Sequence, residues 1–325
     1  MPRLIHLDKM PSRTTPPERG ELPPWDPGGS ALAILRLLYR YRYLTSELLG
    51  MVYEHEQGRG ASQVRHHLTQ LWRYGYVLRF YRPAERGSTQ YVYALSVEGA
   101  HLVVPDEDWP VERRRVYNRA RGRRDYEHLL AVSLLQVLWD LGSPQFDELF
   151  RTVAYWVDKD GDAEHVRNSF TVQLERERGT VRPDTTVLIA HRARGYYRPV
   201  FFEIERTHKN LDRTRQRFRI YDELLTKQHA AAAAVFKREV GKVPEKGMAV
   251  FVAGNWRHAE ALRQVARNTL GLDERGKKTT PDMWFTSLEE FFVERDGREE
   301  ILPPPALFER PIAVNLAGVR GRLVV

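Results

Sequence analysis

The stretch SQVRHHLTQLWRYGYVLRFYRPAERGSTQYVYAL, residues 62–95, decides the fold of the N-terminal part of the chain. Its first half spaces apolar side chains three and four residues apart, at Val64, Leu68 and Leu71. This spacing is typical of a helix with one buried face. Two alternating runs follow at 77–82 and 90–95, joined by a connection that contains glycine, which predicts a β-hairpin. The stretch therefore predicts a helix followed directly by a hairpin.

Two further helices are expected before this stretch. Residues 30–44 carry apolar side chains at helical spacing after Ser30, which can serve as an N-cap. Residues 45–55 repeat the pattern, with Thr45 as the N-cap residue. Three short helices followed by a hairpin is the element order of a winged helix-turn-helix. We therefore predict an α+β winged helix-turn-helix domain over residues 30–105.

The third helix carries groups suited to DNA on the side away from its apolar residues. The candidate contact residues on this side are Gln63, Arg65, His66, Thr69, Gln70 and Arg73. Amides, hydroxyls and guanidiniums match base edges and phosphates in the major groove. Arg79 and Arg82 of the hairpin suit the DNA backbone. Double-stranded DNA is therefore the predicted partner. The alternatives are a small α+β domain held by ordinary core residues and a domain that contacts another protein.

The charge of the chain is compatible with a polyanionic partner. Its 325 residues include 51 Lys and Arg against 43 Asp and Glu, a formal net charge of +8. Arginines concentrate in residues 106–124, at Arg113, Arg114, Arg115, Arg119, Arg121, Arg123 and Arg124. Like charges at this density repel one another unless an anion neutralises them. We predict a basic connector whose Arg113, Arg114 and Arg115 contact phosphates. The alternative is a solvated helix face.

The composition excludes several classes of protein. The sequence contains no cysteine, which rules out disulfides, thiolate zinc sites and cysteine nucleophiles. It has no Walker loop and no GxGxxG motif for nucleotide phosphates. It shows neither a signal-peptide pattern nor an apolar run near the roughly 18 residues that cross a bilayer. We expect a cytoplasmic protein without a membrane partner.

A second pattern, with longer apolar runs, begins after the connector. A long apolar helix is expected first, and the strands are expected at 150–157, 169–177, 185–191, 197–205, 248–254 and 283–287. Together with the charged helices between them, these strands predict an α/β domain with a mixed sheet over residues 125–295. Residues 1–29 are rich in proline and are expected to form a disordered tail. Residues 296–325 are expected to form a C-terminal tail.

Acidic residues gather at the ends of two expected strands. Asp184 precedes one strand, and Glu203 and Glu205 end the next on the same face, because side chains alternate along a strand. If the two strands are neighbours, these carboxylates converge. Carboxylate oxygens are the ligands that Mg²⁺ prefers, so Asp184 and Glu203 are the predicted metal ligands of a Mg²⁺ site. The alternative is a surface cluster of ion pairs.

A Pro-Asp dipeptide followed about 20 residues later by the Glu-x-Glu motif resembles the PD-(D/E)xK nuclease superfamily. Together with the N-terminal domain, the arrangement resembles the replication-relaxation family of plasmid and mobile-element proteins. The resemblance implies a DNA-binding protein that supports plasmid or mobile-element replication and the relaxed state of the DNA. It also implies catalytic roles for Asp184 and Glu203. The lysine of the motif is replaced by Glu205 in this chain.

This replacement bears on catalysis, because the lysine of the motif orients the attacking water. Lys209 and the arginines of the next helix are available instead, namely Arg213, Arg217 and Arg219. A guanidinium cannot act as a base at ordinary pH. Glu127 and His128, on the first helix of this domain, are further candidate ligands. The alternative for these two residues is an ordinary helix end.

Three hypotheses for the function follow. The first is a DNA-binding protein that supports replication and relaxation of a plasmid or mobile element. The second is a metal-dependent nuclease or nickase that uses Asp184, Glu203, Glu205 and Lys209. The third is a winged-helix transcriptional repressor whose second domain serves only to form a homodimer.

Overall fold

The computed structural model divides into two compact units, with the boundary between Leu141 and Gly142. The N-terminal unit is described in residues 23, 25–58, 60–82, 90–110, 113 and 126–141. The C-terminal unit is described in residues 142–157, 169–175, 177–205, 210–272, 281–295, 298–302 and 312–322. None of the helices in these residues has the length and hydropathy needed to cross a lipid bilayer.

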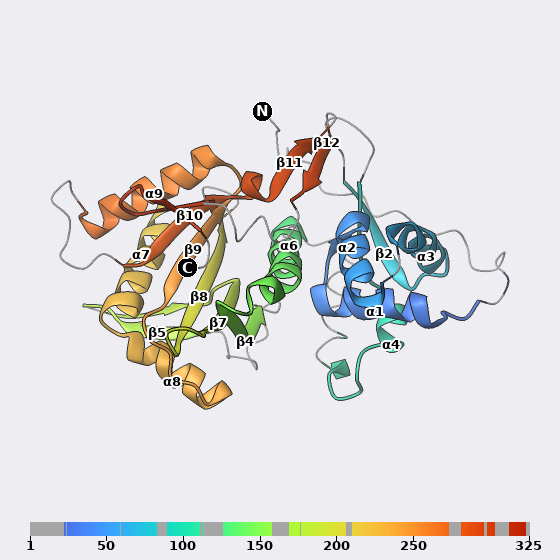
Figure 1. Ribbon diagram of the computed structural model, residues 1–325, viewed down its shortest axis with the longest axis horizontal. Helices are drawn as coiled ribbons and strands as arrows, with labels where there is room; N and C mark the ends of the chain where they lie inside the picture. Colours follow the sequence, from blue (N-terminus) through green and yellow to red (C-terminus); the bar gives the residue numbers. More distant parts are fainter. Residues whose placement is uncertain are drawn as a thin grey trace. The chain divides into compact units, whose positions relative to one another are not determined.

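The N-terminal unit begins with three helices and a small antiparallel sheet (Figure 1). Its elements are α1 (Gly29–Tyr41), β1 (Leu44–Thr45), α2 (Ser46–Gln57), α3 (Ala61–Arg73), β2 (Val77–Arg82), β3 (Gln90–Leu95) and α4 (Val97–His101). Strand β3 lies between β1 and β2, so the hairpin is extended by a short strand that precedes α2. The two strands of the hairpin and the order of the elements agree with the sequence analysis.

Side-chain caps explain where α2 and α4 begin. Helix α1 begins after Gly28 without a side-chain cap, so the cap expected at Ser30 is wrong. The Thr45 hydroxyl accepts a hydrogen bond of 3.2 Å from the backbone N–H of Leu48, which caps α2 as expected. The Ser96 hydroxyl accepts one of 3.0 Å from Gly99 and caps α4. A Cβ at Gly99 would lie 1.9 Å from the carbonyl oxygen of Tyr76. Only glycine therefore allows α4 to approach the turn before the hairpin this closely.

Helix α6 (Tyr126–Gly142) belongs with the N-terminal unit almost to its end. The Ser133 hydroxyl donates a hydrogen bond to the carbonyl oxygen of Tyr41. Asp140 accepts hydrogen bonds of 2.8 Å from the Tyr41 hydroxyl and 2.9 Å from Arg40. The sequence analysis placed this helix in the second domain, starting at residue 125. It could not detect these contacts, because they join residues about 100 positions apart in the chain.

The last residues of the expected N-terminal tail pack against the hairpin side of α3. The Trp25 ring lies 5.0 Å from the Tyr74 ring and 6.0 Å from the Tyr76 ring, measured between centroids. The Tyr74 hydroxyl donates a hydrogen bond of 2.8 Å to the carbonyl oxygen of Pro23. The expected disorder of residues 1–29 therefore does not extend to Trp25, whose aromatic surface is partly buried in this contact.

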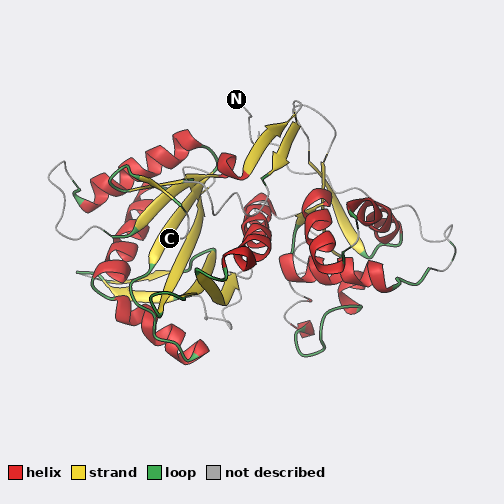
Figure 2. Ribbon diagram, viewed as in Figure 1, coloured by secondary structure: helices red, strands yellow, loops and turns green. Residues whose placement is uncertain are grey.

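The C-terminal unit is built on a mixed sheet, whose strands are yellow in Figure 2. The sheet has seven strands in the order β14-β13-β10-β9-β8-β7-β4. Its strands are β4 (Phe150–Val157), β7 (Thr185–His191), β8 (Tyr196–Glu205), β9 (Met248–Ala253), β10 (Met283–Ser287), β13 (Ala313–Asn315) and β14 (Arg320–Gly321). Strand β9 pairs in parallel with β8 and β10, and the other pairs are antiparallel. The expected mixed sheet is therefore observed.

Three helices pack on one face of this sheet: α7 (Leu211–Thr226), α8 (His229–Val240) and α9 (Trp256–Leu270). Alternate residues of each strand point to this face, and they are apolar. Among them are Leu188, Phe201, Phe251 and Phe285, each at most 1% exposed. The segment between β8 and β9 forms two of these helices, because α7 ends at Thr226 and α8 starts at His229.

Two further hairpins flank the sheet. One consists of β5 (Phe170–Gln173) and β6 (Arg178–Val181), and the other of β11 (Phe292–Arg295) and β12 (Arg298–Ile301). The strand expected at 169–177 is therefore shorter and pairs outside the main sheet. A Cβ at Gly179 would lie 2.6 Å from the Ile220 side chain, so β6 and α7 are in close contact.

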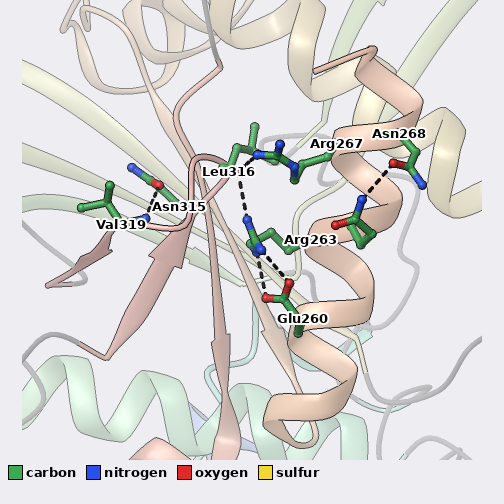
Figure 3. Close-up of polar contacts among 8 residues, drawn as sticks. Glu260, Arg263, Arg267, Asn268, Asn315, Leu316 and Val319 are labelled. Carbon is green, nitrogen blue, oxygen red and sulfur yellow. Dashed lines mark hydrogen bonds and ion pairs between the residues drawn. The ribbon is translucent and has the colours of Figure 1, made fainter. Parts of the chain in front are cut away.

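The C-terminal residues contribute two strands to the sheet, although the sequence analysis assigned residues 296–325 to a tail. Arg263 and Arg267 of α9 donate hydrogen bonds of 3.1 and 2.7 Å to the carbonyl oxygen of Leu316 (Figure 3). Ile312, Ala313 and Leu316 are each at most 1% exposed. Strands of two and three residues give no clear alternation in a sequence, which explains why they were not predicted.

Candidate functional sites

The first candidate site is the exposed side of α3. Val64, Leu68 and Leu71 of this helix are fully buried. Most of the α3 residues predicted to contact DNA are exposed, namely Gln63, Arg65, His66, Thr69 and Arg73. Gln70 is half-buried. The helix therefore separates an apolar side from a polar side, as its sequence predicted.

Contacts within α3 involve Thr69, His66 and His67, and one of them limits the hydrogen bonds that Thr69 can make. The Thr69 hydroxyl donates a bond of 2.9 Å to the carbonyl oxygen of Arg65, so only its oxygen lone pairs are left to accept from another molecule. The rings of His66 and His67 lie 5.7 Å apart, edge to face. Burial, and secondarily the neighbouring His66, lowers the pKa of His67. His67 is therefore neutral at pH 7.

Arg79, which the sequence analysis assigned to the DNA backbone, connects the hairpin to α3. Its guanidinium carbon lies 3.4 Å from the centroid of the Trp72 ring and 4.4 Å from that of the Tyr91 ring. Trp72 belongs to α3 and Tyr91 to β3. Stacking on these rings holds the guanidinium between the helix and the hairpin by cation–π attraction.

A depression of about 220 Å³ lies beside α3. It is lined by Trp25, Gly28, Gly29, Ser30, Ala31, His66, His67 and Gln70. It therefore joins the polar side of α3 to the N-terminus of α1. Gly28 is the N-cap residue of α1, no side chain caps this end, and the first turn holds no acidic residue. The first backbone N–H groups of a helix have no partner within the helix and carry a partial positive charge.

Several of the predicted DNA-contact, catalytic and metal-ligand residues lie outside the described residues. These are Arg114, Arg115 and Lys209, together with the side chains of Arg82 and Glu127. Arg113 is described and exposed. The predicted roles of all these residues stay predictions.

The second candidate site is the acidic cluster of Asp184, Glu203 and Glu205. Strands β7 and β8 are antiparallel neighbours, with Thr185 opposite Phe202. This register places Asp184 beside Glu203. Asp184 accepts a hydrogen bond of 2.7 Å from the backbone N–H of Ile204. The two strands are thus neighbours, which was the condition for the carboxylates to converge.

Helix α7 supplies the partners of these acids. Arg217 and Tyr221 lie four residues apart and therefore on one side of the helix. The Nη1 atom of Arg217 lies 3.2 Å from a carboxylate oxygen of Glu203 and also forms an ion pair with Glu205. The Tyr221 hydroxyl donates a hydrogen bond of 2.8 Å to the other oxygen of Glu203. Glu203, which is 3% exposed, is therefore bound through both oxygens.

Burial and charge shift the ionisation of this cluster. Burial raises the pKa of Glu203 to about 7, although Arg217 and the Tyr221 hydrogen bond act in the opposite direction. The charge of Glu203 raises the pKa of Arg217. Burial raises the pKa of Tyr221 well above its ordinary value, so the phenol stays protonated and donates to Glu203.

The predicted Mg²⁺ site does not fit this arrangement. Within the described residues, no group of three or more His, Asp or Glu side chains is placed to hold a metal ion. Arg217 lies against both glutamates and places one positive charge where Mg²⁺ would bring two. The sequence analysis named Arg217 only as one of three arginines that might replace a lysine. It missed Tyr221, whose spacing from Arg217 was the available signal.

The chain belongs to the replication-relaxation family. The model of this family matches residues 35–240, which is more than half of the chain and runs from α1 to the end of α8. The expected family is thereby confirmed. No curated protein matches the chain.

A search of solved structures returns the restriction endonuclease FokI bound to DNA. The two chains share 12% sequence identity and superpose with a TM-score of 0.26. The match covers 80% of this chain and 43% of the endonuclease chain. A likeness at this TM-score supports no conclusion about fold or function, and none of the proposals below depends on it.

Proposed function

We propose that the N-terminal unit is a winged helix-turn-helix that binds double-stranded DNA, with α3 in the major groove. The observation that carries this proposal is the polar side of α3, where Gln63, Arg65 and Arg73 are exposed opposite fully buried Val64 and Leu68. Amide and guanidinium groups in this arrangement suit base edges and the phosphates at the groove margins. The order of three helices and a hairpin supports the same proposal.

The N-terminus of α1 would contribute a phosphate contact in this complex. It opens into the depression that His66 and Gln70 of α3 also line. When α3 enters the groove, the adjacent backbone N–H groups of α1 would face the flanking strand. Backbone N–H groups at a helix N-terminus bind phosphate well. Arg113 and Arg82 of the hairpin would add further phosphate contacts outside the groove.

The C-terminal unit, in this proposal, has a nuclease-like fold that does not cut DNA. The ion pairs of Arg217 with Glu203 and Glu205 support a structural role for the cluster. Membership of the replication-relaxation family supports a role in replication, and we propose that the DNA is that of a plasmid or mobile element. The homodimer stays a prediction. The salt-dependent DNA binding that is tested below does not depend on it.

Fluorescence anisotropy with a labelled duplex tests the proposal. We expect the affinity of the wild-type chain to fall steeply between about 50 and 200 mM salt, because each phosphate contact releases counterions. Arg65→Ala and Arg73→Ala should each weaken binding by roughly 5- to 150-fold, in line with about 1–3 kcal/mol per lost contact.

The matched control is Arg257→Ala, which removes an exposed arginine from α9 in the other unit. This variant should bind the duplex as the wild type does. Equal losses in all three variants would show that only the total charge matters. Binding that is insensitive to salt would contradict phosphate contacts altogether.

A further inference from the structure

The acidic cluster of Asp184, Glu203 and Glu205 includes a fixed positive charge, the guanidinium of Arg217. The side chain of Arg217 is 34% exposed, whereas the Glu203 side chain beside it is 4% exposed. The Nη1 atom of Arg217 contacts both Glu203 and Glu205. A guanidinium stays protonated at every pH at which the protein is folded. Arg217 is therefore a permanent counter-ion at the point where the carboxylates of β8 meet Asp184.

We propose that Arg217 takes the place of a divalent cation in this cluster and keeps metal ions out of it. A cation that bound Glu203 and Glu205 together would need the oxygens that Arg217 now contacts. Two like-charged groups cannot share these oxygens at close range, because their repulsion is strong in a partly buried site. The guanidinium must leave before a metal ion can enter.

Two more oxygens of the cluster accept hydrogen bonds. One oxygen of Asp184 accepts from the backbone of Ile204, and one of Glu203 accepts from Tyr221. Mg²⁺ requires near-octahedral oxygen ligands at about 2.0–2.1 Å and gives up its water reluctantly. The folded cluster offers too few available oxygens for this geometry. Its carboxylates therefore suit the guanidinium of Arg217 and do not suit Mg²⁺.

This proposal has a consequence that a merely structural ion pair would not have. Removing the guanidinium leaves carboxylates that lack a counter-ion next to one another. An uncompensated buried charge is costly, and a hard cation would relieve that cost. Loss of Arg217 should therefore create a cation site that the wild-type chain does not have.

Terbium luminescence provides the test, because Tb³⁺ binds carboxylates and is sensitised by a nearby tyrosine such as Tyr221. For the wild-type chain we expect the same weak signal as for Glu203→Gln. For Arg217→Ala we expect a saturable signal, with at least tenfold tighter binding than the wild type. Mg²⁺ should compete with this signal, and adding Glu203→Gln should abolish it.

Arg219→Ala is the matched control, since Arg219 is exposed on the same helix. It should behave as the wild type. A wild-type signal that disappears in Glu203→Gln would overturn the proposal, because the cluster would then bind a cation beside Arg217. A folded Arg217→Ala variant without a new signal would also overturn it.

Two provisions keep the test decisive. If Arg217→Ala does not fold, Arg217→Gln keeps most of the side-chain volume and removes the charge. The comparison of the wild type with Glu203→Gln needs no change at Arg217. None of these outcomes bears on DNA binding by α3, so the two proposals can fail separately.

Discussion

Individual side chains show what the alternation of a strand can and cannot predict. Alternation alone placed Glu203 and Glu205 on one face, and Arg217 contacts both of them. The counter-ion itself was not predictable, because Arg217 comes from another element. Only the packing of α7 decides which of its arginines turns inward, and Arg213 and Arg219 remain exposed.

The ionisation of Glu203 leads to a prediction about stability and pH. The carboxyl has an ordinary pKa of 4.5 when unfolded, and burial raises the pKa to about 7 in the folded chain. Between these values the folded state holds a proton that the unfolded state has lost, so the contribution of Glu203 to stability decreases as the pH rises. Glu203→Gln does not titrate. From pH 4.5 to 7, the free energy of unfolding of Glu203→Gln should therefore rise relative to that of the wild type, by on the order of 1–3 kcal/mol.

Urea denaturation of both proteins across this range measures the difference. The comparison uses the change with pH, so a constant offset caused by the substitution does not matter. A difference that stays constant, or that moves in favour of the wild type as the pH rises, would contradict the raised pKa of Glu203.

Secondary-structure elements were predictable where they carry a long periodic pattern or a distinct cap. The hairpin strands β2 and β3 and the strand β7 have the bounds that alternation indicated, and Thr45 caps α2 as expected. The elements that were missed are short or depend on distant partners. Strands β13 and β14 take their place only because β10 offers a free edge within the described sheet.

Arg79 gives the prediction for the junction of helix and hairpin. Arg79→Lys keeps the charge but loses the planar stacking on Trp72 and Tyr91. We expect it to lower the free energy of unfolding by about 1 kcal/mol, and Arg79→Ala by about 2 kcal/mol. Chemical denaturation checks this, with exposed Arg36→Ala on α1 as the control. Substitutions at Arg79 that cost no more than the control would show that the stacking contributes nothing.

The chain as a whole divides at a place that its composition does not reveal. The change from basic to apolar residues near residue 125 suggested a domain boundary, but the compact N-terminal unit continues to Leu141. Periodicity identified α6 as a helix and could not say which unit it contacts. Pairings across about 100 residues, such as Tyr41 with Asp140, are set by tertiary packing alone.

This boundary predicts how fragments behave. A fragment that ends after Gly142 keeps the bonds from Arg40 and Tyr41 to Asp140, whereas one that ends after residue 124 loses them. Each such bond to a charged group contributes about 1.5–3 kcal/mol. The shorter fragment should therefore melt at least about 5 °C lower. Equal melting temperatures by circular dichroism would mean that α6 is not part of the N-terminal unit.

The placement of α3 in the major groove can be tested by photo-crosslinking. A photoreactive amino acid replaces Gln63, which is exposed on the polar side of α3, and in a second protein it replaces Arg257 on α9. The account predicts a crosslink to the bases of a duplex from position 63 and none from position 257. A duplex crosslinked from position 257 but not from position 63, with both proteins folded, would contradict it.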